Sequence, residues 1–270
     1  MTRTRRLVAG TLMIAGTALT AGTALTACGA AGTDAATTAQ SPAPTASETI
    51  LNAMPDTATP AYHYAIKGGT QPFSGVIDPA GKALTAEISE KVPDTPITLS
   101  MKFLVVEEKI WTKVAFTGAT ADMGLPKLPK KWMVLDPAKT GDSDFADLKY
   151  SEAELDPGYV GALVRAADGL KETSPGHFTG TTDLTRSTEA GIVEEKTLTA
   201  LGDKATAVPL EVVVDGEGRV STATVRIPAA GKVKAGTYAV TYDRYGSADA
   251  LTAPEDAVKA PAAAYDLLKG

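Results

Sequence analysis

From about residue 62 onward, apolar and polar residues alternate along much of the chain with a period of two. Every second residue of a β-strand lies on the same face, so this pattern predicts strands with one buried and one solvated face. The alternation is clearest in segment 97–105, where the odd positions are all apolar and positions 98, 100 and 102 are Thr, Ser and Lys. After a turn at 107–109, apolar residues at positions 110, 114 and 116 continue the same face. The two segments therefore predict an antiparallel hairpin with one apolar side.

Weaker versions of this pattern predict further strands. In the first half of the chain we expect an antiparallel meander made of segments 62–66, 73–77, 83–92, 97–105, 110–116 and 132–135. In the second half the predicted strands are 178–184, 210–214, 220–227 and 238–242. The Asp-Gly-Glu-Gly sequence at 215–218 is typical of a tight turn and predicts a hairpin between the two strands beside it.

Two segments carry clear helix-start signals. Thr45 and Glu48 are spaced as a capping box, in which both side chains bind free amides at a helix start. They predict a short amphipathic helix that ends before Pro55 and has Ile50, Leu51 and Met54 on one face. Asp156-Pro157 predicts a second helix, because Asp caps free amides and Pro suits the first helical position. An apolar stripe at helical spacing comes next, at positions 160, 163, 164 and 167.

Segment 189–201 predicts a third, weaker helix, and Pro254 and Pro261 interrupt the segment after the last predicted strand. We find no internal repeat and no second linker after residue 48. The sequence therefore predicts one α+β domain over 48–270: a long curved antiparallel β-sheet with two or three helices against one face.

The start of the chain has the composition of an export signal. Arg3, Arg5 and Arg6 precede a run without charge from residue 7 to residue 25. The run has about the roughly 20 residues that a membrane-spanning anchor helix needs, so an anchor is one alternative. Its many Gly, Ala and Thr residues make it only weakly apolar, which favours a cleaved signal.

The sequence Leu25-Thr26-Ala27-Cys28 resembles the lipobox of bacterial lipoproteins, whose cysteine is acylated and becomes the first residue of the mature chain. Cys28 is the only cysteine of the chain. An ordinary secretory signal followed by a spare thiol is the other alternative. The lipobox interpretation makes Cys28 the lipid anchor.

This interpretation divides the chain into a signal peptide (1–27), a flexible tether rich in Ala, Thr and Ser (28–47) and the folded domain (48–270). It predicts a protein that is exported and held by at least two acyl chains on the outer face of the cell membrane. Arg5-Arg6 permits a twin-arginine export route, and the general secretory route stays open.

Composition and net charge exclude some classes of binding partner. The chain is 44% apolar and 21% charged, which is ordinary for a globular protein with its own core. Removing residues 1–27 takes away three arginines and changes the formal net charge from −6 to −9. An acidic chain without a basic stripe argues against nucleic acid as a partner and against membrane binding by charge alone. With Cys28 acylated, no cysteine is left for a disulfide.

The chain carries none of the common catalytic or metal signatures. A Gly-x-Ser-x-Gly elbow and a His-Glu-x-x-His pair are absent, and one acylated cysteine excludes paired-thiol zinc sites. The two histidines, His63 and His177, fall on predicted strands, where a surface position is the simpler interpretation. We therefore expect no enzyme activity, no catalytic residue, no metal site and no cofactor.

Two polar clusters have weaker functional interpretations. Asp142, Asp144 and Asp147 resemble a calcium loop, but the sixth position lacks glycine and the twelfth lacks glutamate, which favours an ordinary acidic loop. A basic cluster could contact lipid headgroups, although a solvated turn explains it as well; its members are Lys127, Lys130 and Lys131. Tyr242 and Tyr245 could line a binding mouth, but aromatic strand residues usually pack.

Three motifs in the second half carry a family resemblance. They are a Gly-His-Phe-Thr-Gly strand at 176–180, the sequence Ala-Val-Pro-Leu-Glu-Val-Val-Val-Asp-Gly at 207–216, and Tyr-Asp-Arg-Tyr-Gly at 242–246 followed by Ala253-Pro254. In this order behind a lipobox, they make the chain similar to the actinobacterial LppX/LprG-type lipoprotein family, over roughly residues 50–257. The resemblance implies a half-open β-barrel with helices on its concave side, and a space between sheet and helices that holds acyl chains of cell-envelope lipids.

The resemblance and the apolar face together predict a non-catalytic lipoprotein that binds or shuttles a lipid or an acylated ligand. Candidate lining residues of its cavity are Leu99, Met101, Phe103, Val105, Val114 and Phe116. The same residues would suit an ordinary solid core. In that case the alternative function is an envelope interaction or sensor module with the same fold and no ligand cavity. The ligand and any protein partner stay open.

Overall fold

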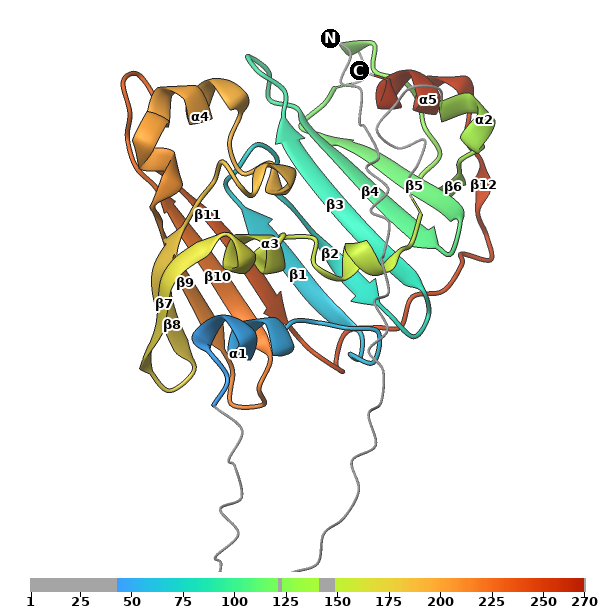
Figure 1. Ribbon diagram of the computed structural model, residues 1–270. Helices are drawn as coiled ribbons and strands as arrows, with labels where there is room; N and C mark the ends of the chain where they lie inside the picture. The colour runs from blue at the N-terminus through green and yellow to red at the C-terminus, as the bar shows by residue number, and fades with distance from the viewer. Residues whose placement is uncertain (1–42, 121–122, 141–148, 270) are drawn as a thin grey trace, which may run out of the picture. The chain divides into compact units, whose positions relative to one another are not determined.

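Twelve strands form one open, mostly antiparallel sheet (Figure 1). The strands are β1 Tyr62–Lys67, β2 Phe73–Asp78, β3 Ala83–Lys91, β4 Thr98–Val106, β5 Lys109–Thr117, β6 Met133–Val134, β7 Ala167–Ser174, β8 His177–Thr182, β9 Val208–Val214, β10 Val220–Ile227, β11 Gly236–Asp243 and β12 Val258–Lys259. Their order in the sheet is β12-β6-β5-β4-β3-β2-β1-β11-β10-β9-β8-β7. The predicted meander is therefore present as β1 to β6, and β11 pairs with β1, so the two halves of the chain meet inside the sheet. β12 pairs with β6 in the parallel direction.

This computed structural model describes residues 43–120, 123–140 and 149–269. These residues belong to one compact unit. The predicted signal peptide, the lipobox with Cys28 and most of the predicted tether lie outside the described residues. The predicted acidic loop with Asp142, Asp144 and Asp147 lies outside them as well.

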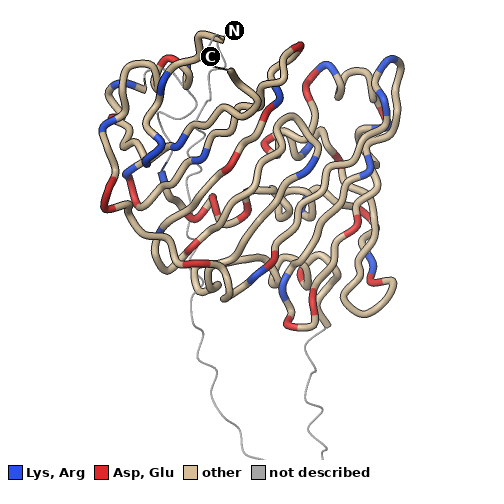
Figure 2. The backbone as a smooth tube through the Cα atoms, turned by 180° about the vertical axis from the view of Figure 1, so that it is seen from behind, with Lys and Arg blue, Asp and Glu red and all other residues tan. Residues whose placement is uncertain are grey.

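The helical segments are short. They are α1 Ala46–Asn52, α2 Pro137–Thr140, α3 Val160–Arg165, α4 Glu195–Leu201 and α5 Ala262–Leu268, with the 3₁₀ helices η2 Glu152–Leu155, η3 Thr188–Ala190 and η4 Gly202–Thr206. α1 and α3 lie in front of the sheet in Figure 1, and the view from behind in Figure 2 shows Lys/Arg and Asp/Glu of both signs spread over the strands. Within the described ranges, no helix is both long enough and apolar enough to cross a membrane.

The capping box at the start of α1 is confirmed. The Glu48 amide donates to Thr45 Oγ1 (3.2 Å), and the Thr45 amide donates to Glu48 Oε2 (2.7 Å). The helix starts at Ala46, directly after the capping residue Thr45, so it occupies the last two residues of the predicted tether. Its Ile50 side chain is completely buried.

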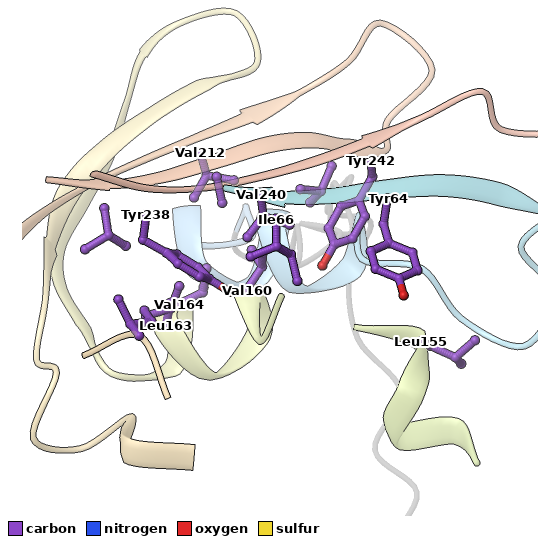
Figure 3. Close-up of a cluster of buried hydrophobic side chains, with 14 of the residues drawn as sticks. Tyr64, Ile66, Leu155, Val160, Leu163, Val164, Val212, Tyr238, Val240 and Tyr242 are labelled. Atoms are coloured by element: carbon purple, nitrogen blue, oxygen red, sulfur yellow. The ribbon is translucent and has the colours of Figure 1, made fainter. Parts of the chain in front are cut away.

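The core lies between the sheet and α3. Residues Val160 to Val164 of α3 are all buried, as expected for a helix that is apolar on every side. Figure 3 shows the side chains of Val160, Leu163 and Val164 facing apolar side chains of the sheet. Those labelled on the sheet include Ile66, Val212, Tyr238 and Val240. Two layers thus enclose one main apolar core.

The predictions for two helices need correction. The second helix begins at Val160 rather than at Pro157, because Tyr159 takes a left-handed conformation (φ 53°, ψ 30°) that interrupts a helix. Ala167 is wrong as a helix residue, since α3 ends at Arg165 and Ala167 starts β7. The third predicted helix is shorter than 189–201: only Glu195–Leu201 is α-helical, and η3 covers Thr188–Ala190.

The sequence analysis does not predict the short helical segments α2, η2 and η4, nor three further elements whose absence has a physical reason. β7 is an exposed edge strand with the sequence ADGLKETS, and charges with irregular pairing are typical of edges that must not aggregate. β12 has two residues, too few for a periodic pattern. α5 starts directly after Pro261, because proline, which interrupts a helix from inside, is compatible with a helix start.

Candidate functional site

Three adjoining pockets lie on the side of the sheet that carries α3. The first, the tyrosine pocket, has a volume of about 200 Å³. It is lined by Tyr64, Phe73, Ile77, Leu84, Ala86, Ala153, Glu154, Asp156, Pro157 and Tyr159. Strands β1 to β3 therefore form its floor, and segment 153–159, which runs from within η2 to the start of α3, forms its wall.

The second pocket, the junction pocket, has a volume of about 260 Å³ and shares Phe73, Pro157 and Tyr159 with the tyrosine pocket. The third, the lysine pocket, has a volume of about 410 Å³ and includes Lys196 and Lys234. It shares Thr70 with the junction pocket. Because neighbouring pockets share lining residues, the three lie side by side in a row, which we call the groove.

Three tyrosines of the sheet hold the wall of the groove in place. The Tyr62 hydroxyl donates to the Leu155 carbonyl oxygen (2.5 Å), and the Tyr238 hydroxyl donates to the Gly158 carbonyl oxygen (2.9 Å). The Tyr242 hydroxyl donates to Asp156 Oδ1 (2.5 Å). Tyr238 and Tyr242 project from β11 toward the helical segments in Figure 3. The sheet therefore positions segment 155–158 through hydroxyl groups.

Asp156 is the central acceptor of this arrangement. Besides the Tyr242 hydroxyl, its carboxylate accepts the Val160 amide (2.9 Å) and the Gly161 amide (2.8 Å) at the start of α3. Burial raises the pKa of the Asp156 carboxyl, while the three hydrogen bonds and the nearby Arg165 guanidinium act in the opposite direction. Asp156 thus caps α3, as predicted from the sequence, but from four residues before the helix starts.

The floor of the tyrosine pocket depends on a glycine. Tyr64 lies opposite Gly75 in the β1–β2 register, and its hydroxyl donates to the Thr85 carbonyl oxygen of β3 (2.9 Å). The Val76 amide donates to Thr85 Oγ1 (2.9 Å). The Tyr64 hydroxyl therefore lies where β2 and β3 depart from a regular ladder. A Cβ atom on Gly75 would come within 1.8 Å of the Thr85 carbonyl oxygen.

Glu154 is the other carboxylate in the wall of the tyrosine pocket. Burial raises the pKa of its carboxyl group. The Glu154 charge in turn contributes to the raised pKa of Tyr64, although burial of the Tyr64 ring is the larger cause. Glu154 and the Tyr64 hydroxyl are therefore neighbours across the pocket.

We expect Glu154→Gln to raise the melting temperature at pH 7–8 by about 1–3 °C, the effect of somewhat less than 1 kcal/mol in a domain of this size. The folded protein holds the Glu154 proton to higher pH than the unfolded chain does. Its stability therefore falls as the pH rises from the unfolded pKa of about 4.3 through the raised folded pKa. The advantage of the variant should disappear below pH 4. Glu152→Gln, at an exposed position of the same η2 helix, is the control. A gain that does not depend on pH would contradict the expectation.

The six predicted cavity residues do share one face, since Leu99 pairs with Phe116 and Met101 pairs with Val114. None of the six lines a pocket of the groove. Phe103 and Val105 are buried in the main core, and the other end of the face packs under α5. The residues of that second cluster include Leu99, Val114 and Phe116, together with Met133 and Ala264.

The other candidate residues have ordinary structural roles. His63 Nδ1 lies 2.8 Å from Asp243 Oδ1 of the neighbouring strand, and His177 is exposed on β8. Lys131 pairs with Asp256 (3.3 Å) at the surface. The Tyr245 hydroxyl donates to the Val220 carbonyl oxygen (2.8 Å). Within the described residues, no group of three His, Cys, Asp or Glu side chains is placed to hold a metal ion.

Sequence reasoning did not identify Glu154 or Tyr159 as site residues. The signal that could have drawn attention to this segment was present, because Asp156-Pro157 marked a helix start directly beside them. What it lacked was any indication that the segment crosses β1, β2 and β3.

No protein-family model matches the chain, and no curated protein sequence matches it. Among solved structures, the chain is similar to a porin-like protein from Bacteroides uniformis ATCC 8492, with 11% sequence identity. The match covers 70% of this chain and 99% of that chain, with a TM-score of 0.24. A score this low supports no conclusion about fold or function.

Proposed function

We propose that the protein is a membrane-anchored cell-envelope lipoprotein that binds or shuttles a lipid or an acylated ligand, without catalysis. The observation that carries the proposal is the groove between the sheet and the segments 153–159 and 189–197. Ile66, Phe73 and Tyr238 of the junction pocket offer an apolar wall to an acyl chain. The lipobox and the family resemblance of the sequence point to the same class of protein.

The proposal includes the finer architecture that the resemblance implies, a half-open barrel with helices on its concave face. Two observations support it. The sheet is open, with β7 and β12 at its two edges. α1 and α3 lie on one side of the sheet (Figure 1), and segment 153–159, which lines the tyrosine pocket, leads directly into α3.

The size of the groove sets the kind of cargo. Small-molecule sites usually enclose about 300–1,000 Å³, and the tyrosine pocket alone, at about 200 Å³, is smaller. A single acyl chain must therefore extend into the junction pocket. Withdrawing a chain of sixteen carbons from a bilayer costs roughly 12 kcal/mol, at about 0.8 kcal/mol per methylene. A groove that covers only part of such a chain favours exchange close to the membrane over long-range transport.

Ala86→Phe is expected to abolish ligand binding, because Ala86 lines the tyrosine pocket and a phenyl ring would fill it. The full-length protein would be produced in a lipidating host and extracted with organic solvent, which leaves the covalent acyl groups on Cys28. Mass spectrometry of the extract should show about one lipid per wild-type chain and less than a tenth of that for Ala86→Phe.

Ala115→Phe is the matched control, since Ala115 is exposed and pairs with Ser100 on the opposite face of the sheet. It should retain the lipid. An extract of the wild type without lipid would contradict the proposal. That result would favour the alternative, an interaction or sensor module without a ligand cavity.

Cys28→Ser tests the anchor. The change removes the thiol that accepts the acyl chains, so we expect the processed protein to be missing from the membrane fraction of the host. Fractionation and immunoblotting measure this directly, with Ser41→Ala in the predicted tether as the control. A wild type and a Cys28→Ser variant that are both found in the membrane fraction at the same, uncleaved size would contradict the lipobox interpretation and favour an anchor helix.

A further inference from the structure

The two pockets that share Tyr159 are acidic. Among the ten residues that line the tyrosine pocket, Glu154 and Asp156 are acidic and none is basic. The lining of the junction pocket adds Glu189 and again contains neither Lys nor Arg. Basic residues line the groove only at its far end, in the lysine pocket. An anionic group is therefore poorly matched to the tyrosine end of the groove.

The two carboxylates of the tyrosine pocket, Asp156 and Glu154, differ in the hydrogen bonds that they accept. Both Asp156 oxygens accept hydrogen bonds from the Tyr242 hydroxyl and from α3 amides. No described residue is seen to donate a hydrogen bond to the half-buried Glu154 carboxylate or to form an ion pair with it. A partly buried carboxylate without a counter-charge loses hydration and gains nothing in exchange. Glu154 is thus free to pair with a positive group of a ligand.

Aromatic rings surround the same space. Tyr64 and Phe73 form an edge-to-face pair with their centroids 5.7 Å apart and an interplanar angle of 78°. Tyr159, which is 41% exposed, lines the pocket from the wall. Faces of aromatic rings attract ammonium groups, and quaternary ammonium ligands are commonly bound by several rings together. Rings beside an acidic group make up a site of this kind.

We propose that the ligand is an amphiphile with an ammonium headgroup, and that this cation binds in the tyrosine pocket against Glu154. The inference rests on the proposed function, whose ligand class it narrows. The acyl chain then runs along the junction pocket, past Tyr159 toward Thr70. A compact headgroup suits a pocket of about 200 Å³ better than a long chain does.

The first test uses two molecules of the same shape: choline and its uncharged carbon isostere, 3,3-dimethylbutan-1-ol. Binding to the full-length protein in vesicles of an uncharged glycolipid is measured by calorimetry. We expect choline to bind at least tenfold more tightly than the isostere. Glu154→Gln should remove that preference and leave the affinity for the isostere within twofold, whereas Glu152→Gln should behave like the wild type.

The second test separates a lipid headgroup from a free small cation. Octyltrimethylammonium should bind at least tenfold more tightly than tetramethylammonium, because its chain enters the junction pocket. If the octyl chain did not increase the affinity, the site would be assigned to a small free ammonium compound. The inference that the cation is the headgroup of a lipid would then be overturned.

Equal affinity for choline and its isostere, or equal choline affinity of the wild type and Glu154→Gln, would overturn the inference. If lipid still co-purified with the protein in that case, the proposed lipid-binding function would stand, and only the inference of an ammonium headgroup would fall. Selective choline binding by a chain that carries no lipid would instead overturn the proposed function and leave the ammonium site in place.

Discussion

Replacing Asp156 by alanine is expected to lower the free energy of unfolding by about 4 kcal/mol. The Asp156 carboxylate accepts the Tyr242 hydroxyl and two amides at the start of α3. The change removes the acceptor and leaves all three donors behind, and each buried donor without a partner costs about 1–3 kcal/mol. For a domain of this size the melting temperature should fall by about 10 °C, which calorimetry or circular dichroism measures.

Two further variants test whether the loss of stability comes from the Asp156 carboxylate. Tyr242→Phe removes a single donor and should cost about 1.5 kcal/mol, and the double variant gives the coupling energy of the pair. Asp203→Ala, at an exposed position of η4, should leave the melting temperature within 1–2 °C of the wild type. An Asp156→Ala protein that melts like the wild type would mean that water replaces the carboxylate. The groove would then have no fixed wall.

The Gly75→Ala variant is expected to lose about 3 kcal/mol of stability, seen as a melting temperature lower by about 8 °C. The added Cβ would lie 1.8 Å from the Thr85 carbonyl oxygen and 2.9 Å from the Tyr64 hydroxyl. The first of these neighbours is backbone, so β2 and β3 must separate to make room. The Tyr64 ring would move with them and deform the floor of the tyrosine pocket.

Gly236→Ala is the matched control, because Gly236 also lies in a strand and a Cβ there would meet no atom within 4 Å. Its melting temperature should stay within 1–2 °C of the wild type. If Gly75→Ala folded equally well, the opening between β2 and β3 would be tolerant of a side chain. A tolerant opening could not define the pocket.

The stability of the domain and the shape of the groove depend on the same residues. The groups that hold the wall of the tyrosine pocket belong to the same tyrosines that fill the core, such as Tyr62 and Tyr242, which are both almost completely buried. Glu154 is the exception in this region, since its carboxylate stabilises nothing that the structure shows. A residue that lowers stability at neutral pH and lines a pocket is a natural candidate for binding.

The predicted lining residues show where sequence reasoning stops. The period-two pattern correctly places Leu99, Met101 and Val114 on one face, as the β4–β5 register confirms. Whether such a face lines a space depends on what covers it. α5 covers one end, and its sequence lies directly after Pro261, which by itself indicates a break. The pattern therefore marks the face as available for a cavity, while Phe103 and Val105 lie in the main core and Leu99 packs in the cluster under α5.

Neighbouring residues along the chain encode the strands of the meander, the capping box of α1, the capping role of Asp156 and an α+β fold. These features can be predicted because they depend on periodicity and on contacts over a few positions. The groove arises only from tertiary packing, because Tyr64, Leu84 and Glu154 come from distant parts of the chain and meet only when segment 153–159 crosses β1 to β3. Local patterns record which residues are apolar, and only packing decides which of them face one another and which face an open space.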